Sequence, residues 1–394
     1  MHLIDHTVPA EGTYIKSVAS ATKPPVYTID LSLPPSERYM QLATDYKQKI
    51  QGLPALFEDL VAATPVPLLL VTWLSRLVLR RLHSKEQTEE IRGISKITGV
   101  DIGGMRVWDE GSGGQSDVKH TKMLHFRTLD WGMDALREVI VQLEFVERPG
   151  GQVVARSITY VGFVGVITGI RKSLSVSLNF RPYHDDKTLK ANISFYTNQV
   201  LVLLGLRPSI ASRLRTYIVP EKLHIESSGE RTVPTQATLS EIRDELPNAP
   251  TTAAYIIMCS GSDTTVMEKD HRNAQVYTST SFITATNHDA TDESNKSIPV
   301  LKNTKLNVAP GLQDLIDDSR DRKACITDKW RKALKSCRRR NRTATEDNFA
   351  VDMGQLIRWV QTYPTTNDST HFACVMDPSE GDIVWVKQFE ASLE

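Results

Sequence analysis

Cysteine is scarce in this chain and unevenly distributed. The 394 residues include four cysteines, and the first of them is Cys259. No two cysteines form a Cys-x-x-Cys pair, so the sequence excludes a disulfide scaffold and offers no spacing for a structural zinc site. We therefore expect no metal centre and no cofactor.

Long apolar runs are also missing. The most apolar stretch, Val66–Leu79, is interrupted by Arg76 and is shorter than the ~20 residues that a membrane-spanning helix needs. Two interpretations stay open. The stretch is either a buried or amphipathic helix, or a helix that lies on a lipid surface with Trp73 at the level of the headgroups.

Neither sign of charge is in excess. The 47 Lys and Arg residues balance 47 Asp and Glu residues, which argues against a surface built throughout for nucleic acid. We therefore expect no nucleic-acid partner. Residues 1–14 are polar and lack the basic-then-apolar layout of a signal peptide, so a cytoplasmic location is the default expectation.

The common catalytic signatures are absent. The chain has no Gly-x-Ser-x-Gly, no His-Glu-x-x-His and no dinucleotide-binding fingerprint, which excludes the usual hydrolase and metalloenzyme patterns. The glycine-rich stretch Gly111–Gly114 is not followed by Gly-Lys-Ser/Thr. We therefore interpret 103–122 as a flexible exposed loop rather than a phosphate-binding loop.

The composition itself is ordinary for a globular protein, with 40% apolar and 24% charged residues. Residues 1–23 are interpreted as a loose tail, 24–99 as a small N-terminal domain with one strand (Tyr27–Leu33) followed by helices, 100–122 as a loop or truncated junction, and 123–394 as the core. The expected strands of the core are Glu138–Glu147, Val153–Tyr160, Phe163–Ile167, Leu174–Phe180, Ala253–Cys259, Thr265–Lys269, Ala274–Tyr277, Ser281–Ala285, His371–Met376 and Ile383–Val386. The expected helices of the core are Val200–Leu206, Ile210–Tyr217, Thr238–Glu245, Gln313–Arg340 and Asp352–Thr362. This order of helices and strands predicts an α+β layered sandwich, in which the first four strands form an antiparallel meander.

Two groups of polar residues are candidates for a site. Arg127 and Asp130 stand three residues apart in an expected turn, where they form a structural ion pair or converge on one ligand. Thr286–Asp289 follows an expected strand. Asn287 in it offers an amide to a developing oxyanion, and His288 and Asp289 offer groups for acid–base chemistry, unless the segment is an Asx-capped turn.

A basic run near the C-terminus has no assigned role. Lys329–Arg342 holds eight Lys or Arg residues in fourteen. A solvated helix face, a nuclear signal and a patch for anionic lipid all agree with such a run.

Several stretches, in order along the chain, resemble the family of acid ceramidases and N-acylethanolamine-hydrolysing acid amidases, and in particular its fungal members. PPVYTIDLSLPPSERY, GISKITG and RTLDW are similar to three of the family's landmarks. The stretches that carry the resemblance are Pro24–Tyr39, Gly93–Gly99, Arg127–Trp131, Tyr160–Thr168, Leu174–Arg181, Ala253–Asp270, Thr286–Asp289 and Tyr363–Trp385.

The resemblance implies an N-terminal-nucleophile hydrolase with an αββα sandwich behind a small helical domain. Such an enzyme cuts itself before a cysteine, whose thiol then attacks an amide while its own α-amino group acts as base. By resemblance, the substrate is a lipid amide, ceramide or an N-acylethanolamine. Arg127 and Asp130 would steer the nucleophile, Asn287 would hold the oxyanion, and Trp131, Asn179 and His288 would contact the substrate. A lipid substrate also favours the surface-lying interpretation of Val66–Leu79.

The chain departs from the family at the nucleophile. The family places a Cys-Thr-Ser between the GIS and Arg-x-x-Asp landmarks, but no cysteine stands between Gly93 and Asp130. Ser112 or Ser116 is a poor substitute if 103–122 is a flexible loop. A second departure is Phe180, where animal members carry Glu. We therefore expect an amidase that is inactive or incomplete as written, through an exon error, a splice variant or a true loss. The alternative is a pseudoenzyme that binds lipid without hydrolysing it.

Overall fold

The computed structural model describes residues 22–51, 82–98, 114–117, 122–182, 184–185, 187–220, 236–291 and 312–390. The stretch Val66–Leu79, the expected tail 1–21 and most of the expected loop 103–122 lie outside these residues. Among the described residues, no helix combines the length and the apolar character needed to span a bilayer.

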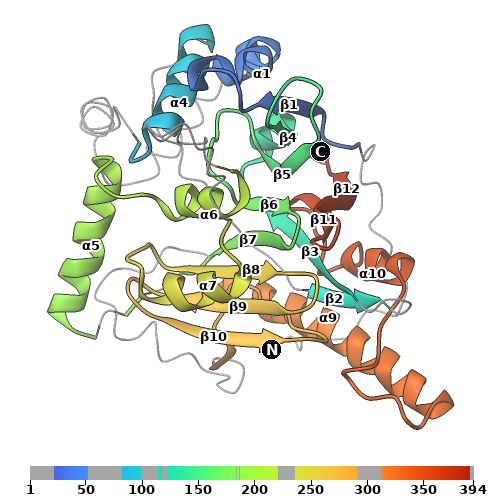
Figure 1. Ribbon diagram of the computed structural model, residues 1–394. Coiled ribbons are helices and arrows are strands. Elements are labelled where there is room, and N and C mark those ends of the chain that lie inside the picture. Colours follow the sequence, from blue (N-terminus) through green and yellow to red (C-terminus); the bar gives the residue numbers. More distant parts are fainter. Residues whose placement is uncertain are drawn as a thin grey trace, which may run out of the picture.

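Two β-sheets form the centre of the protein (Figure 1). The larger sheet has eight strands in the order β1-β4-β5-β6-β7-β8-β9-β10, and all its neighbours are antiparallel except the parallel pair β1–β4. Its strands are β1 Val26–Asp30, β4 Ile140–Val146, β5 Val153–Tyr160, β6 Thr168–Arg171, β7 Leu174–Phe180, β8 Ala254–Cys259, β9 Thr264–Lys269 and β10 Ala274–Ser279. The smaller, antiparallel sheet has the order β12-β11-β3-β2, with β2 Gly114–Asp117, β3 Lys122–Asp130, β11 Thr370–Asp377 and β12 Asp382–Gln388.

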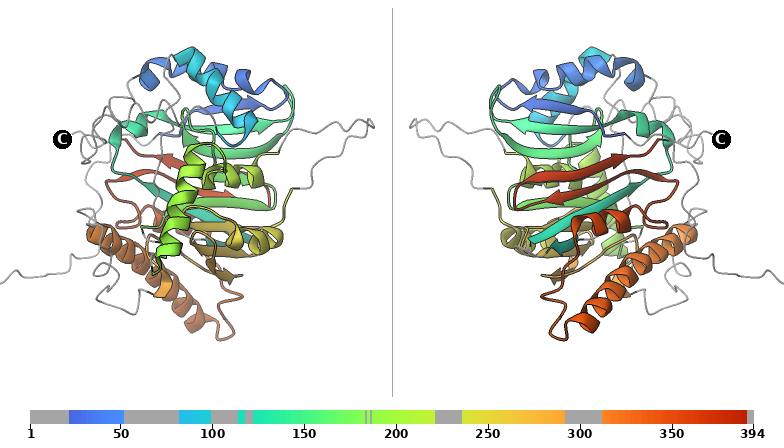
Figure 2. Two further views of the ribbon diagram at one scale, coloured as in Figure 1. Left: turned by 90° about the vertical axis from the view of Figure 1, so that its left-hand side faces the viewer. Right: turned by 90° about the vertical axis from the view of Figure 1, so that its right-hand side faces the viewer.

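Helices cover the outer face of each sheet, as the side views show (Figure 2). The larger sheet is covered by α6 Ile210–Ile218 and α7 Leu239–Glu245, and the smaller sheet by α9 Leu312–Arg340 and α10 Met353–Val360. Helix α5 Leu189–Leu203 lies at the ends of the strands, where Ser194 is hydrogen-bonded to His271 (Figure 1). On the smaller sheet, Phe126 and Val375 pack with Trp330 of α9. The expected α+β class and the α, β, β, α order of layers are confirmed.

The side chains of β7 show how the layers are assigned. Leu174, Val176 and Leu178 belong to the main hydrophobic cluster, which also contains Leu214 of α6. Ser175 and Ser177 alternate with them and hydrogen-bond the two ring nitrogens of His125 on β3, each at 2.9 Å. Because neighbouring residues of a strand point to opposite faces, Ser175 and Ser177 point into the space between the two sheets, while the apolar residues of β7 point toward the helices.

The N-terminal segment is joined to the larger sheet through β1. It continues with the short 3₁₀ helix η1 (Pro35–Glu37), α1 (Met40–Asp45) and α4 (Lys85–Thr98). Glu90 of α4 is buried and accepts hydrogen bonds from Arg38 at 2.9 Å and from Arg215 of α6 at 2.7 Å. This buried cluster connects the N-terminal segment to the helix layer of the core.

Most expected elements are confirmed to within a few residues, among them the meander β4–β7 and the long helix α9, but two expected strands are wrong. Phe163–Ile167 is a turn, in which the Val166 amide bonds the Ala211 carbonyl of α6 at 3.1 Å instead of a strand neighbour. Ser281–Ala285 leaves the sheet, and Phe282 stacks on Trp330 of α9 with ring centroids 4.8 Å apart. Contact with α6 replaces strand pairing in the first segment. In the second, Phe282 packs on α9 while Ile283 and Ala285 pack against β8 and β9.

The expectation of a loop throughout 103–122 is also wrong in part. Gly114–Asp117 is strand β2, which pairs with β3 so that Ser116 lies opposite Met123. Polar, glycine-rich sequence has low intrinsic strand propensity, but the neighbouring edge of β3 supplies hydrogen-bond partners that the local sequence does not reveal.

Candidate functional site

Arg127 and Asp130 lie in strand β3, so the expected turn at this position is wrong. A three-residue spacing along a strand places two side chains on opposite faces of the sheet. Arg127 faces the space between the two sheets, and Asp130, the last residue of β3, faces α9. The ion pair of Asp130 is formed with Arg322 of α9.

Arg127 is a fully buried cation held by backbone carbonyl groups. Its guanidinium donates to the carbonyl oxygens of Ile167 and of Leu178, the latter at 3.0 Å from Nη2. Burial lowers the pKa of Arg127 to about 10, partly offset by nearby groups such as Cys374. The guanidinium therefore remains charged at neutral pH, beside the end of β7.

Both carboxylate oxygens of Asp130 have a donor. Oδ1 accepts from the Thr370 hydroxyl at 2.6 Å, and Oδ2 accepts from Arg322 Nη1 at 2.8 Å. Burial raises the pKa of Asp130, while the charge of Arg322 and the Thr370 hydrogen bond act in the opposite direction. The carboxyl group is thus fixed in orientation from two sides.

Asn287 is buried and connected to the same arginine. Its Oδ1 accepts from Arg322 Nη2 at 3.2 Å, and its Nδ2 donates to the Phe180 carbonyl at 2.9 Å. Its backbone amide donates to Ser319 Oγ at 2.6 Å. Arg322 therefore links Asp130 to Asn287, and the end of β7 lies between Asn287 and Arg127. The three residues expected to support catalysis are assembled in one buried cluster.

The three residues expected to contact substrate lie around this cluster. Asn179 of β7 is 1% exposed, and among the described residues its side-chain amide has no hydrogen-bond partner. Such a group costs roughly 1–3 kcal/mol and calls for a functional explanation. His288 is buried with Nδ1 2.9 Å from Ser319 Oγ. Trp131 is half-buried and follows Asp130 directly.

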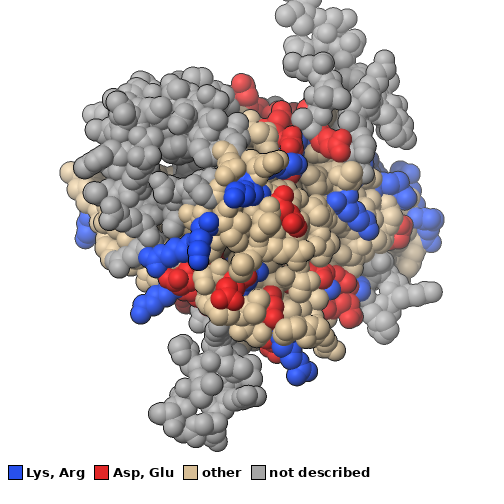
Figure 3. All heavy atoms as spheres, turned by 90° about the horizontal axis from the view of Figure 1, so that it is seen from above, with Lys and Arg blue, Asp and Glu red and all other residues tan. Residues whose placement is uncertain are grey.

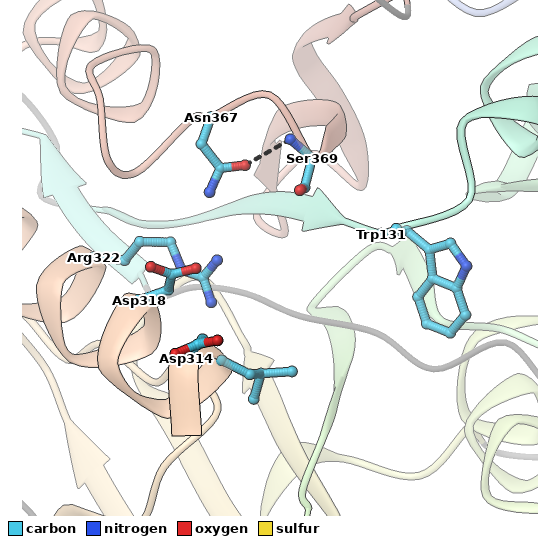
Figure 4. Close-up of a pocket in the computed structure, with 8 residues that line it drawn as sticks. Trp131, Asp314, Asp318, Arg322, Asn367 and Ser369 are labelled. Atoms are coloured by element: carbon cyan, nitrogen blue, oxygen red, sulfur yellow. Dashed lines mark hydrogen bonds between the residues drawn. The ribbon is translucent and has the colours of Figure 1, made fainter. Parts of the chain in front are cut away.

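A polar pocket of about 230 Å³ opens beside the cluster (Figure 4). Trp131, Asn367 and Ser369 line it on one side, and Asp314 and Asp318, one turn apart on α9, line it on another. The residues that line it are Trp131, Gly132, Asp314, Leu315, Asp318, Arg322, Asn367 and Ser369. This lining suits a group that donates hydrogen bonds better than it suits an acyl chain.

None of the four cysteines lies at the start of a strand. Cys374 is buried in the middle of β11, opposite Arg127, and burial raises the pKa of its thiol to about 12. Cys259 ends β8, and burial raises the pKa of its thiol to about 11. Cys325 and Cys337 lie half-buried on α9. Among the described residues, no group of His, Cys, Asp or Glu is placed to hold a metal ion.

Sequence reasoning missed Arg322, Ser319 and Thr370. The sequence of α9 does contain a pattern that could have identified Arg322 and Ser319. The buried residues of this helix are spaced three or four apart. These residues are Ile316, Ser319, Arg322, Ile326, Trp330 and Leu334. Two polar residues on an otherwise apolar helix face indicate a buried polar partner.

The protein is an α+β sandwich. A buried cluster of charged and polar residues lies at the ends of its strands, beside a small pocket. Residues 22–83 match the family model described as the beta subunit of N-acylethanolamine-hydrolyzing acid amidase. A Caenorhabditis elegans protein named N-acylethanolamine-hydrolyzing acid amidase is 30% identical over 210 residues, which are 46% of this chain and 58% of that protein. Over these residues the chain is similar to N-acylethanolamine-hydrolyzing acid amidases.

The aligned region spans less than two thirds of the C. elegans relative's length. A solved structure of the C. elegans N-acylethanolamine-hydrolyzing acid amidase ortholog aligns at a TM-score of 0.46 and 21% identity, over 69% of this chain and 94% of that one.

Proposed function

We propose that this chain has the framework of a lipid amide hydrolase and that, as written, it does not turn over its substrate. The observation that carries the first half is the cluster in which Arg322 joins Asp130 to Asn287 at the edge of a polar pocket. The substrate class is taken from the family: an N-acylethanolamine, or a ceramide with its larger amine.

The cluster suits amide chemistry on three counts. Asn287 carries an amide N–H group of the kind that stabilises a tetrahedral oxyanion. Asp130 is an oriented carboxylate that can position an amine. The Arg127 cation adds positive potential close to where negative charge develops on the substrate oxygen. Asn179, with its buried and unpartnered amide, adds a group suited to hydrogen-bonding a substrate.

The second half of the proposal follows from the cysteines. Cys259 and Cys374 are buried thiols whose raised pKa keeps them protonated at neutral pH, and the thiolate is the nucleophilic form. Cys325 and Cys337 belong to α9, outside the strand ends where the cluster lies. No other cysteine exists in the chain.

Hydrolysis assays on the purified full chain test this. We expect no self-cleavage and no release of fatty acid from a fluorescent ceramide or N-acylethanolamine across an acidic to neutral pH series. Arg127→Ala and Asn287→Ala serve as controls, both expected at the same background. Turnover by the unmodified chain above both variants would contradict the proposed inactivity.

The genomic reading frame tests the origin of the missing nucleophile. An in-frame coding stretch with Cys-Thr-Ser between the codons for Ile102 and Gly103 would show that the active enzyme is a longer product. An uninterrupted exon would favour a pseudoenzyme that binds lipid amides. Binding of a non-hydrolysable N-acylethanolamine analogue, lost in Asn287→Ala but kept in Lys172→Ala on a distant exposed turn, would support that alternative.

Contact with a lipid surface also belongs to this proposal. Helix α5 presents Leu189, Ile193, Tyr196 and Val200 to solvent at 48–76% exposure, while its buried residue is Asn198. Spacings of three and four residues place these side chains along one stripe of the helix. Such a stripe suits an apolar surface, and the expected surface helix Val66–Leu79 would act with it. Replacement of Ile193 and Val200 by Glu is expected to weaken binding to neutral vesicles.

A further inference from the structure

The C-terminal half of α9 carries a dense group of cations that the proposed hydrolase site does not use. We define the basic tip as the six exposed Lys and Arg residues at this end of the helix together with Arg342 just beyond it: Arg331, Lys332, Lys335, Arg338, Arg339, Arg340 and Arg342. No Asp or Glu occurs between Lys329 and Thr345. In Figure 1 this end of the helix extends beyond both sheets, at the lower right.

The helix that carries the basic tip is firmly anchored. Ile326, Trp330 and Leu334 are buried, and the Trp330 ring packs against Phe282 and Phe349 with centroid distances of 4.8 Å in each case. One side of the helix is therefore fixed by the core while the other carries the charges. The backbone that carries the cations is therefore already ordered before a partner binds.

The charges of the basic tip are largely unneutralised. Arg331 lies 3.8 Å from Asp328, and Arg338 Nε donates to the Ala344 carbonyl at 3.0 Å. Within the described part of the chain, the other five members have no ion pair. In the middle of the face seen in Figure 3, by contrast, Lys and Arg side chains are interspersed with Asp and Glu. Positive charge is thus concentrated at one projecting end of a neutral chain.

We propose that the basic tip is a docking site for an anionic lipid surface. Clusters of four to eight Lys and Arg residues bind anionic headgroups mainly through charge, and a projecting helix end reaches a flat surface without obstruction. The aromatic residues at this end, Trp330 and Phe349, are buried, so the stacking platforms of single-stranded nucleic-acid binders are missing here. The choice of a membrane over nucleic acid also rests on the proposed lipid substrate.

Vesicle flotation with the full chain tests the proposal, without any substrate. The probe is phosphatidylcholine vesicles with and without phosphatidylserine, at about 0.1 M salt, where charges interact over ~10 Å. We expect binding to the anionic vesicles that falls steeply with added salt. The triple variant Arg338→Glu, Arg339→Glu and Arg340→Glu should weaken binding about a hundredfold or more, because each cation near an anionic surface contributes roughly a factor of five.

A variant with the same change in charge elsewhere is the control. Lys47, Arg148 and Lys172 are exposed and lie outside α9, so their joint replacement by Glu should reduce binding far less than the triple variant does. Equal binding by the triple variant and the unmodified chain would overturn the proposal, as would tighter binding to a DNA duplex than to the anionic vesicles. The assay measures vesicle binding alone. Its result can therefore be interpreted even if the proposed hydrolase function is wrong.

Discussion

Glu90 and Asp130 are two buried carboxylates with arginine partners, yet they serve different parts of the molecule. Glu90 uses one oxygen, Oε1, to accept from two arginines, Arg38 and Arg215, while Oε2 has no hydrogen-bond partner among the described residues. Asp130 divides its two oxygens between Arg322 and a hydroxyl. The first arrangement neutralises charge between three segments of the chain, and the second fixes the direction of a carboxyl group beside a pocket.

The comparison shows that burial and an arginine partner do not by themselves identify a catalytic carboxylate. Burial raises the pKa of both groups. What distinguishes Asp130 is its surroundings, because its partner Arg322 also binds Asn287 and lines the pocket. We therefore expect changes at Glu90 to act on the stability of the assembled chain, and changes around Asp130 to act mainly within the site.

The largest effect is expected from Glu90→Ala. This change leaves Arg38 and Arg215 buried without their shared counter-charge, and removal of one partner of a buried ion pair costs about 3–5 kcal/mol. Urea unfolding of both proteins measures the difference. The neighbouring Glu89→Ala is the control, since Glu89 forms an exposed pair with Arg92, and its cost should stay below about 1 kcal/mol. Equal costs for the two variants would show that the Glu90 cluster is not structural.

A smaller effect is expected from the coupling of Asp130 to Arg322. In a double-mutant cycle with Asp130→Asn and Arg322→Met, we expect an interaction free energy of about 1–3 kcal/mol. The exposed pair Asp317–Arg320 on the same helix provides the control cycle, with an expected coupling below about 0.5 kcal/mol. Additive costs for Asp130 and Arg322 would contradict the connected cluster.

The smallest effect is the pH dependence contributed by Glu90. Because burial raises its pKa in the folded chain above the unfolded value, the folded state binds more protons in the window above pH ~4.5. Its contribution to stability is therefore complete below that pH and is lost as the pH rises through the folded pKa. The unfolding free energy of the unmodified chain minus that of Glu90→Gln should be larger at mildly acidic than at neutral pH. If this difference in unfolding free energy were larger at neutral than at mildly acidic pH, the predicted direction of the pH dependence would be wrong.

The strands were the most predictable part of the fold. Alternation of apolar and polar residues identified β4, β5 and β7, and a capping box at Thr238 and Glu241 marks the start of α7. The failures at Phe163–Ile167 and Ser281–Ala285 share a cause. In both, an apolar segment makes contacts with a helix that is remote in sequence, through Val166 in the first and Phe282 in the second, and local periodicity does not reveal such contacts.

The site was predicted as residues but not as an arrangement. Arg127, Asp130 and Asn287 were candidates from their polar motifs, and the catalytic roles that the resemblance gave them stay predictions. An ion pair between Arg127 and Asp130 was one of two arrangements that their spacing allowed. Because β3 extends to Asp130, the two side chains lie on opposite faces of one strand instead. Thr370 and Arg322 could not be paired with Asp130 from sequence, since they lie 240 and 192 residues away along the chain.

By itself, the sequence determined the family that the chain resembles, the α+β class and the absence of a cysteine where that family keeps its nucleophile. Landmark motifs, local periodicity and composition suffice for these, because each is a property of neighbouring residues. Only the tertiary structure decided that Arg322 joins Asp130 to Asn287 and that all four cysteines lie away from the start of a strand. Those facts depend on which distant segments the sheets and helices bring into hydrogen-bonding distance, and local pattern does not carry that information.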